Sequence, residues 1–309
     1  MNTTPLVIKT SYGDTTPLVI KTSLKDTTPL ATKNPHERDQ YATLDEATHV
    51  YDIKGETDYV SMTTFIHNLF RKFDENKIID TMMASKKWPT NKYYGQTKQE
   101  IKDMWEKNKV EASTAGTTMH YDIECFYNDI NNPPQNDSIE FKYFMNFHTD
   151  FKDRLEPYRT EWIVYDEDIK IAGSIDMIFK KTSDEILEIY DWKRCKEIVK
   201  STNFNKWSTN ELIDHIPDTN YWHYSLQLNG YKYILNKNYN KQITDLYLVC
   251  LHPDNEHKNG NYLRIKVPDM QEEIHQLFEE RKQTNKQTNK QTNKQTNKQT
   301  NKQIIKTTK

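Results

Sequence analysis

The chain has 309 residues, of which 43 are basic and 45 are acidic, so its formal net charge is −2. That average hides basic ends: residues 34–281 hold 43 of the acidic but only 31 of the basic side chains, which excludes a uniformly basic nucleic-acid coat and a polybasic membrane-surface protein. The same segment is long enough for one large globular domain, and we assign residues 35–281 to it.

Both ends of the chain consist of short repeats. Residues 3–14 and 15–26 each begin with TTPLVIKTS, a partial third copy follows, and the proline in each copy disfavours a helix. Five KQTN units follow from Lys282 onward, and a slipped four-base microsatellite would produce their period, because AAAC read three times encodes Lys-Gln-Thr-Asn. Neither composition can build a core, so we expect residues 1–34 and 282–309 to be disordered. The alternative for the tail is a weak, salt-sensitive contact with phosphate backbones.

Between the repeats, hydrophobic spacing predicts helices first and strands afterwards. We expect helices over residues 59–73, 97–107, 114–128 and 139–155. Strands rich in β-branched and aromatic residues follow, over residues 161–165, 169–180 and 185–193. The remaining elements are a helix, a strand buried on both faces, an edge strand and a closing helix, over residues 221–235, 244–251, 262–267 and 270–281. This order predicts an α/β fold with a mixed central sheet flanked by helices, a core over residues 114–267 and extra N-terminal helices over residues 59–110.

Glycine and cysteine patterns exclude several cofactors. No two of the seven glycines lie within five residues of each other, so neither a P-loop nor a dinucleotide-binding glycine motif can occur, and we expect no nucleotide cofactor. The three cysteines lack the spacing of a zinc site or a disulfide framework. With no secretory signal and no apolar run of membrane-spanning length, these patterns predict an intracellular protein, cytoplasmic or nuclear, without a membrane partner.

The strands on either side of residues 181–185 carry the candidate chemistry. In a symmetric hairpin around this polar turn, residues whose numbers sum to 367 face each other, which places Asp176 opposite Asp191 and puts Lys193 on the same face. Like charges directly opposite destabilise a hairpin by roughly 0.2–1 kcal/mol, so this pair needs a compensating cation.

A divalent metal would supply that charge, since Mg²⁺ prefers carboxylate oxygens as ligands. Two carboxylates and an ammonium are the groups that metal-assisted phosphodiester hydrolysis requires. The alternative is a solvated strand end with a Lys–Asp pair.

Other motifs join this hairpin in a fixed order. G-S-I-D at residues 173–176 and D-W-K at residues 191–193 resemble motifs II and III of the PD-(D/E)XK nuclease superfamily. G-T-T-M-H-Y-D-I-E at residues 116–124 is similar to the helical first motif of its RecB-like exonuclease branch, and Q-L-N-G-Y at residues 227–231 is similar to that branch's Q-x-x-x-Y motif.

The resemblance implies a restriction-endonuclease-like αβββαβ core and a Mg²⁺- or Mn²⁺-dependent DNA nuclease, an exonuclease in replication, recombination or repair with a separate helicase or recombination partner. Its implied metal ligands are His120, Asp176, Asp191, the backbone carbonyl of Trp192 and, directly or through water, Glu124. Lys193 would orient or activate the attacking water beside the catalytic Asp176 and Asp191, and Gln227 and Tyr231 would contact the substrate. The iron–sulfur cluster of some relatives is not expected, because the three cysteines are not clustered. The alternatives are an RNA-processing nuclease and a non-catalytic nucleic-acid-binding or assembly module on the same fold.

Overall fold

The computed structural model describes residues 28–183, 186–202, 206–254 and 260–288, and every structural statement below refers to these residues. Its helices are α1 (Pro29–Lys33), η1 (Asp39–Tyr41), α2 (Met62–His67), α3 (Glu75–Met83), η2 (Trp88–Thr90), α4 (Lys98–Asn128), α5 (Ile139–Phe151), η3 (Glu211–Ile213), α6 (Asn220–Asn238) and residues 271–288. Its strands are β1 (Ala42–Asp45), β2 (Val50–Ile53), β3 (Val60–Ser61), β4 (Leu155–Asp166), β5 (Ile171–Lys181), β6 (Leu187–Lys193), β7 (Ile243–Cys250) and β8 (Leu263–Lys266). No helix among them combines the length and the apolar character that a membrane span requires.

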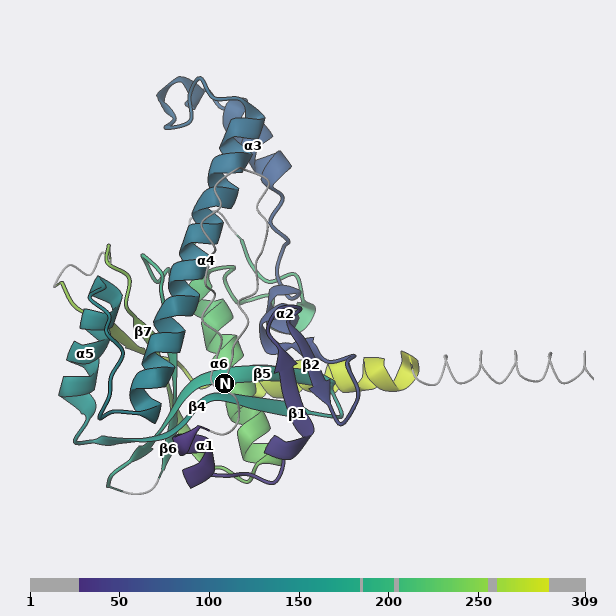
Figure 1. The fold of residues 1–309 in the computed structure, drawn as a ribbon. Coiled ribbons are helices and arrows are strands. Elements are labelled where there is room, and N and C mark those ends of the chain that lie inside the picture. The colour runs from purple at the N-terminus through teal and green to yellow at the C-terminus, as the bar shows by residue number, and fades with distance from the viewer. Residues whose placement is uncertain (1–27, 184–185, 203–205, 255–259, 289–309) are drawn as a thin grey trace, which may run out of the picture.

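A six-stranded mixed sheet forms the centre of the molecule (Figure 1). A mixed sheet was predicted, but its sixth strand, β3, lies within residues 59–73, where a helix was expected. β4, β5 and β6 are antiparallel neighbours, β6 and β7 are parallel, and β8 is antiparallel to β7 at the edge. The short strand β3 runs parallel to the start of β5, where Val60 pairs with Ile171. Since β4 occupies the other edge of β5 along its length, β3 and β6 share one edge, at opposite ends of β5.

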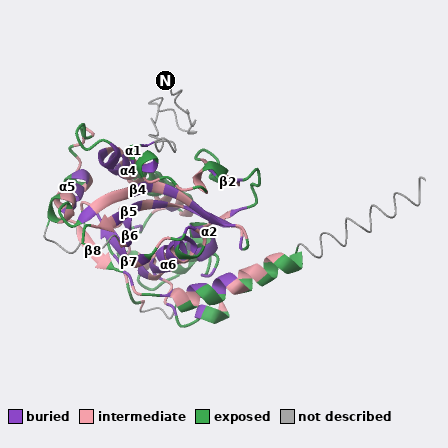
Figure 2. Cartoon of the chain, turned by 90° about the horizontal axis from the view of Figure 1, so that it is seen from below, coloured by how far each residue is buried: buried purple, intermediate pink, exposed green. Residues whose placement is uncertain are grey.

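Helices cover both faces of this sheet (Figure 2). α4 and α5 pack on the face that carries Met177 and Tyr190, whereas α6, α2 and residues 271–288 pack on the face that carries Ile178 and Ile189. Buried side chains along β5 and β6 thus alternate between the two faces with the period of two that strands require. The predicted mixed sheet flanked by helices is confirmed.

The helix α4 differs most from the prediction, because one helix of 31 residues replaces the two expected over residues 97–107 and 114–128. It begins with a capping box, in which the Thr97 side chain accepts the backbone N–H of Glu100 and the Glu100 side chain accepts that of Thr97. Gly116 lies within the helix without ending it, since a glycine there costs only about 1 kcal/mol relative to alanine.

The helix predicted over residues 59–73 is also wrong in its extent. Ser61 caps α2 by accepting the backbone N–H of Thr64, so the helix begins at Met62, and it ends at His67. Phe73, expected on its packed face, is 72 % exposed. The hairpin of β1 and β2 was not predicted.

Helical backbone extends into both terminal repeats, over residues 29–33 and 282–288. Pro29 occupies the first turn of α1, where a proline costs no hydrogen bond, and Thr28 caps that helix. At the other end, helical backbone continues through residues 282–288, and Lys282 forms an ion pair with Asp168. The remaining repeat residues lie outside the described part of the chain.

An arm stands away from the sheet at the top of Figure 1. We define it as residues 74–105, which comprise α3, η2 and the first turns of α4. Ile79, Tyr93 and Ile101 form its own small buried core. The next eight residues of α4, residues 106–113, are exposed on every side of the helix, and we call them the stalk. α4 therefore connects the arm to the sheet as one continuous helix.

Candidate metal centre

The sheet opens between β5 and β6 at the predicted chemical groups. Met177 pairs with Tyr190 and Ile178 with Ile189, which confirms the predicted register. The pairing ends at Met177 and Tyr190, so Asp176 and Asp191 lie just beyond it. Asp176 Oδ2 accepts the backbone N–H of Trp192 at 2.8 Å.

The open stretch of β5 coincides with the G-S-I-D motif. β3 pairs with Ile171 and Ala172, and β6 begins to pair at Met177, so residues 173–176 have no strand partner on this edge. Unpaired strand edges offer polar groups and space to a ligand or to side chains from other elements. The motif therefore lies at a gap in the sheet rather than inside a continuous ladder.

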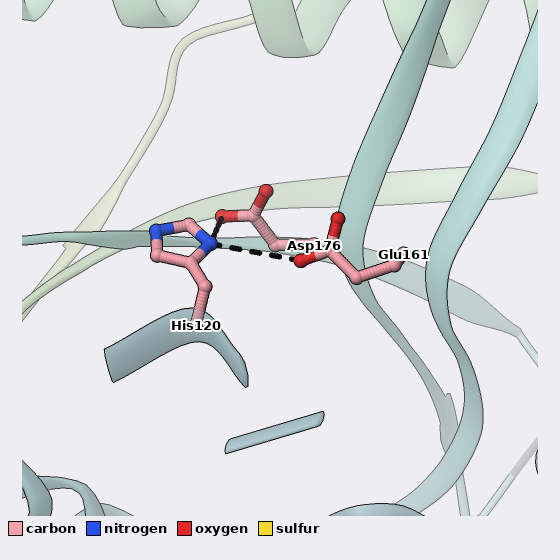
Figure 3. Close-up of side chains that lie close together, drawn as sticks. All are labelled: His120, Glu161 and Asp176. Atoms are coloured by element: carbon pink, nitrogen blue, oxygen red, sulfur yellow. Dashed lines mark ion pairs between the residues drawn. The ribbon is translucent and has the colours of Figure 1, made fainter. Parts of the chain in front are cut away.

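Three side chains from different elements converge at this gap (Figure 3). Nδ1 of His120, on α4, lies 3.5 Å from Oδ2 of Asp176, on β5, and 3.6 Å from Oε1 of Glu161, on β4. The three potential ligand atoms all lie within 4.8 Å of one another. One imidazole nitrogen and two carboxylate oxygens at this separation can hold a divalent cation.

Glu161 is the member of this group that the sequence reasoning missed. Its neighbours Thr160 and Trp162 pair with Met177 and Ile175, so Glu161 lies opposite Asp176. Asp176 therefore faces a second carboxylate on β4, which was not predicted, while the predicted partner Asp191 lies just beyond the end of the β5–β6 ladder. Symmetric pairing across the turn predicted at residues 166–168 would place position 161 opposite position 173, so the observed register, three residues further along β5, could not be read from that turn.

The backbone at Glu161 is strained. Its φ of +41° lies in the left-handed region, which non-glycine residues rarely adopt. Strain of this kind costs on the order of 1–3 kcal/mol and is concentrated at functional sites. Ser174 Oγ donates a hydrogen bond of 2.8 Å to Glu161 Oε2, which fixes the direction of the carboxylate.

Lys193 and Asp191 form an ion pair beside the three-residue group. Lys193 Nζ lies 2.7 Å from Asp191 Oδ2 and 4.6 Å from the centre of the Tyr224 ring. Burial raises the pKa of Asp191 to about 6 despite the positive charge of Lys193, and the negative charge of Asp176 adds to this increase. Burial alone would lower the pKa of Lys193, but Asp191 and Asp176 outweigh it and hold that pKa above its ordinary value. Lys193 is therefore a permanent cation near neutral pH.

His120 is also held in its charged form. Burial disfavours the imidazolium, but the negative charges of Asp176 and Glu161 outweigh this effect and raise the pKa of His120 to about 9. Burial raises the pKa of Asp176, against the charge of His120. At neutral pH a proton on His120 thus provides the positive charge between the two carboxylates.

The structure places the other predicted ligands outside the three-residue group. Glu124 is buried one helical turn after His120, but among the described residues the group within 4.8 Å comprises His120, Glu161 and Asp176 alone. Asp191 is 2 % exposed and lies next to this group rather than in it. The Trp192 side chain packs in the aromatic core under α4 and α5, and its backbone carbonyl stays a predicted ligand.

Gln227 and Tyr231 meet on one face of α6, as their spacing predicts. Gln227 Nε2 donates a hydrogen bond of 3.4 Å to the Tyr231 hydroxyl. Tyr231 is only 3 % exposed and lies against Gly173, where an added Cβ would be 2.5 Å from the hydroxyl oxygen. Its ring therefore packs beside the G-S-I-D stretch, and substrate contact by Gln227 and Tyr231 stays a prediction.

In comparisons with known proteins, no family model and no curated sequence matched the chain.

Proposed function

We propose that this protein is a metal-dependent nuclease of the PD-(D/E)XK type that hydrolyses phosphodiester bonds in DNA. The observation that carries the proposal is the group of His120, Glu161 and Asp176 beside the Lys193–Asp191 ion pair at the opening of the sheet. The element order α4, β4, β5, β6, α6, β7 supports a restriction-endonuclease-like αβββαβ core.

The donor set favours Mn²⁺ or Mg²⁺ as the cation. His120 offers nitrogen, while Glu161 and Asp176 offer hard oxygen ligands. Imidazole is a better ligand for softer divalent metals than for Mg²⁺, so we expect tighter binding of Mn²⁺. When bound, such a cation supplies Lewis-acid polarisation of the phosphate and lowers the pKa of a bound water.

The residues of the chain would have separate roles. Lys193 provides a fixed positive charge that can stabilise negative charge developing on the phosphate, and Asp191 holds its ammonium in place at 2.7 Å. His120 must release its proton before its ring nitrogen can bind a cation. Ser174 orients Glu161, and the Trp192 N–H orients Asp176.

A cleavage panel tests the proposal. Purified protein with Mn²⁺ should degrade linear duplex DNA, and resistance of circular DNA would establish an exonuclease; single-stranded DNA and RNA complete the panel. Lys193→Ala should lower the rate about 10²–10³-fold, because it removes a positive charge that stabilises the developing charge on the phosphate. Lys196→Ala is the matched control, because this lysine is three residues away, exposed and paired with Asp254. Full activity of Lys193→Ala would refute the proposal.

The alternatives give other results in the same experiments. Preferential cleavage of RNA would assign the site to RNA processing. Mn²⁺ binding detected by calorimetry and lost in Asp176→Asn, without cleavage of any substrate, would indicate a non-catalytic binding module.

A further inference from the structure

The tip of the arm has an unusual charge pattern. We define the tip as residues 84–98, which lie between α3 and the first residue of α4. No acidic residue occurs between Asp80 and Glu100, although residues 34–281 as a whole are strongly acidic. The tip instead carries four lysines: Lys86, Lys87, Lys92 and Lys98.

Three of these lysines form no ion pair among the described residues, although Lys92 Nζ lies 4.7 Å from the centre of the Tyr93 ring. Lys98 forms an ion pair with Asp80 at 2.7 Å, whereas Lys86, Lys87 and Lys92 are exposed. Elsewhere in the molecule exposed lysines are commonly paired, for example Lys33 with Glu156. Unpaired positive charges brought together on one loop favour an anionic partner.

Aromatic rings accompany these charges. The ring of Tyr94 is 59 % exposed and its centre lies 6.0 Å from that of Trp88. Tyr93 is buried in the arm's core and presents no ring face to solvent. The Trp105 side chain donates a hydrogen bond to the Tyr93 hydroxyl, which fixes the loop on α4. Lysines interleaved with an exposed aromatic ring are typical of surfaces that bind nucleic acid through phosphate contacts and base stacking.

The position of the tip relative to the metal centre is set by α4. Lys98 and His120 are 22 residues apart in one helix, which corresponds to about 33 Å at a rise of 1.5 Å per residue. That length equals roughly 10 base pairs of duplex DNA. The stalk between them is exposed on all sides, so it does not pack against the sheet.

We propose that the tip of the arm is a second nucleic-acid contact, at which Lys86, Lys87 and Lys92 bind the phosphate backbone of DNA about 10 base pairs from the metal centre. The choice of DNA as the ligand rests on the proposed nuclease function. The tip compensates locally for the acidic charge of the domain, which would otherwise repel the substrate.

Binding measured without catalysis tests this surface. Fluorescence anisotropy of a labelled 30-base-pair duplex in EDTA, at several KCl concentrations, compares the full chain with Lys86→Ala/Lys87→Ala/Lys92→Ala. We expect about tenfold weaker binding at low salt, and a slope of log K against log [KCl] that is shallower by about two to three, or about one per lysine. Single-stranded DNA and matching RNA distinguish the preferred nucleic acid, and Tyr94→Ala should weaken binding to single strands more than to duplex.

The control removes three positive charges outside the arm, with Lys152→Ala/Arg154→Ala/Lys266→Ala. These side chains are exposed; Lys152 caps the end of α5, Arg154 precedes β4 and Lys266 ends β8. A tip variant that binds with the same affinity and the same salt slope as this control would overturn the proposal.

A cleavage experiment separates this inference from the proposed function. If the chain is a nuclease, the tip variant should cleave a 30-base-pair duplex with reduced kcat/KM but cleave a hairpin with an 8-base-pair stem at the normal rate, because the short stem cannot reach from the metal centre to the tip. Equal loss on both substrates would contradict a remote contact. If the tip variant binds DNA more weakly in EDTA with a shallower salt dependence, but the full chain cleaves no substrate, the DNA contact at the tip stands and the proposed nuclease function is wrong.

Discussion

Glu161 lies opposite Asp176 across the β4–β5 ladder, and both carboxylates point toward the same ring nitrogen of His120 (Figure 3). Two like charges at facing positions destabilise a sheet unless a cation lies between them. In the metal-free protein a proton on His120 supplies that charge, which is consistent with the pKa of about 9. At the proposed metal site, a bound cation would therefore displace this proton.

Glu161→Gln should weaken Mn²⁺ binding by more than about tenfold, because it removes one of the two carboxylates that face His120. Isothermal titration calorimetry at constant pH measures this change. Glu124→Gln is the matched control, since Glu124 is a buried glutamate on the same helix as His120 but lies outside the three-residue group. If Glu161→Gln binds Mn²⁺ as tightly as the wild type and Glu124→Gln binds it more weakly, then Glu124 and not Glu161 is the metal ligand.

Mn²⁺ affinity should rise with pH, by up to about tenfold per unit between pH 7 and 9, and level off above pH 9. The sign follows from the raised pKa of His120: below about 9 the ring holds a proton that the metal must displace. Calorimetry in buffers of different ionisation enthalpy should detect about one proton released near pH 7.5. In His120→Gln this release should disappear. An affinity that does not change with pH in the wild type would show that the cation binds elsewhere.

Asp191→Asn should lower the free energy of unfolding of the metal-free protein by up to about 3 kcal/mol, because it leaves the ammonium of Lys193 without its nearest anion. Urea denaturation at neutral pH measures the difference. Asp191→Asn/Lys193→Met removes both charges and should recover part of the loss. If the double variant is less stable than Asp191→Asn, the unpaired ammonium of Lys193 does not account for the loss of stability in Asp191→Asn.

Gly173→Ala should lower the free energy of unfolding by about 1–3 kcal/mol, since the new methyl group would be 2.5 Å from the Tyr231 hydroxyl and either β5 or α6 must shift. Gly116→Ala provides the comparison. No atom lies within 4 Å of the position of its added Cβ, and alanine in a helix should stabilise the protein by about 0.5–1 kcal/mol. Thermal denaturation measures the stability of both variants. Equal stability of Gly173→Ala and the wild type would mean that Tyr231 does not pack closely on β5.

The central sheet was predictable because its information is local. Alternation along β5 and β6 assigned Met177 and Ile178 to opposite faces, and the polar turn at residues 181–185 fixed the register of the hairpin. Both signals depend on neighbours in the sequence and on the period of two of a strand. His120 and Asp176, expected to meet from a helix and a strand, do lie together.

Other features depend on contacts between distant segments. Glu161 could not be assigned to the site from the sequence of its own strand, because only the pairing of β4 with β5 brings it to Asp176. Tyr231, on α6, can be buried because Gly173, on β5, has no side chain that would occupy the same space. Helical backbone at residues 282–288 could not be expected from composition, since it continues a helix whose Leu277 and Phe278 are packed in the main core.

The continuity of α4 has a consequence for how this chain can change during evolution. One residue inserted into the stalk would turn the whole arm by about 100° around the helix axis and move it by about 1.5 Å relative to His120. The lysines would then face a different side of the molecule. Insertions of seven residues would nearly restore their direction and lengthen the helix by about 10.5 Å, or roughly three base pairs. Homologous chains should therefore differ in stalk length by whole pairs of helical turns rather than by single residues.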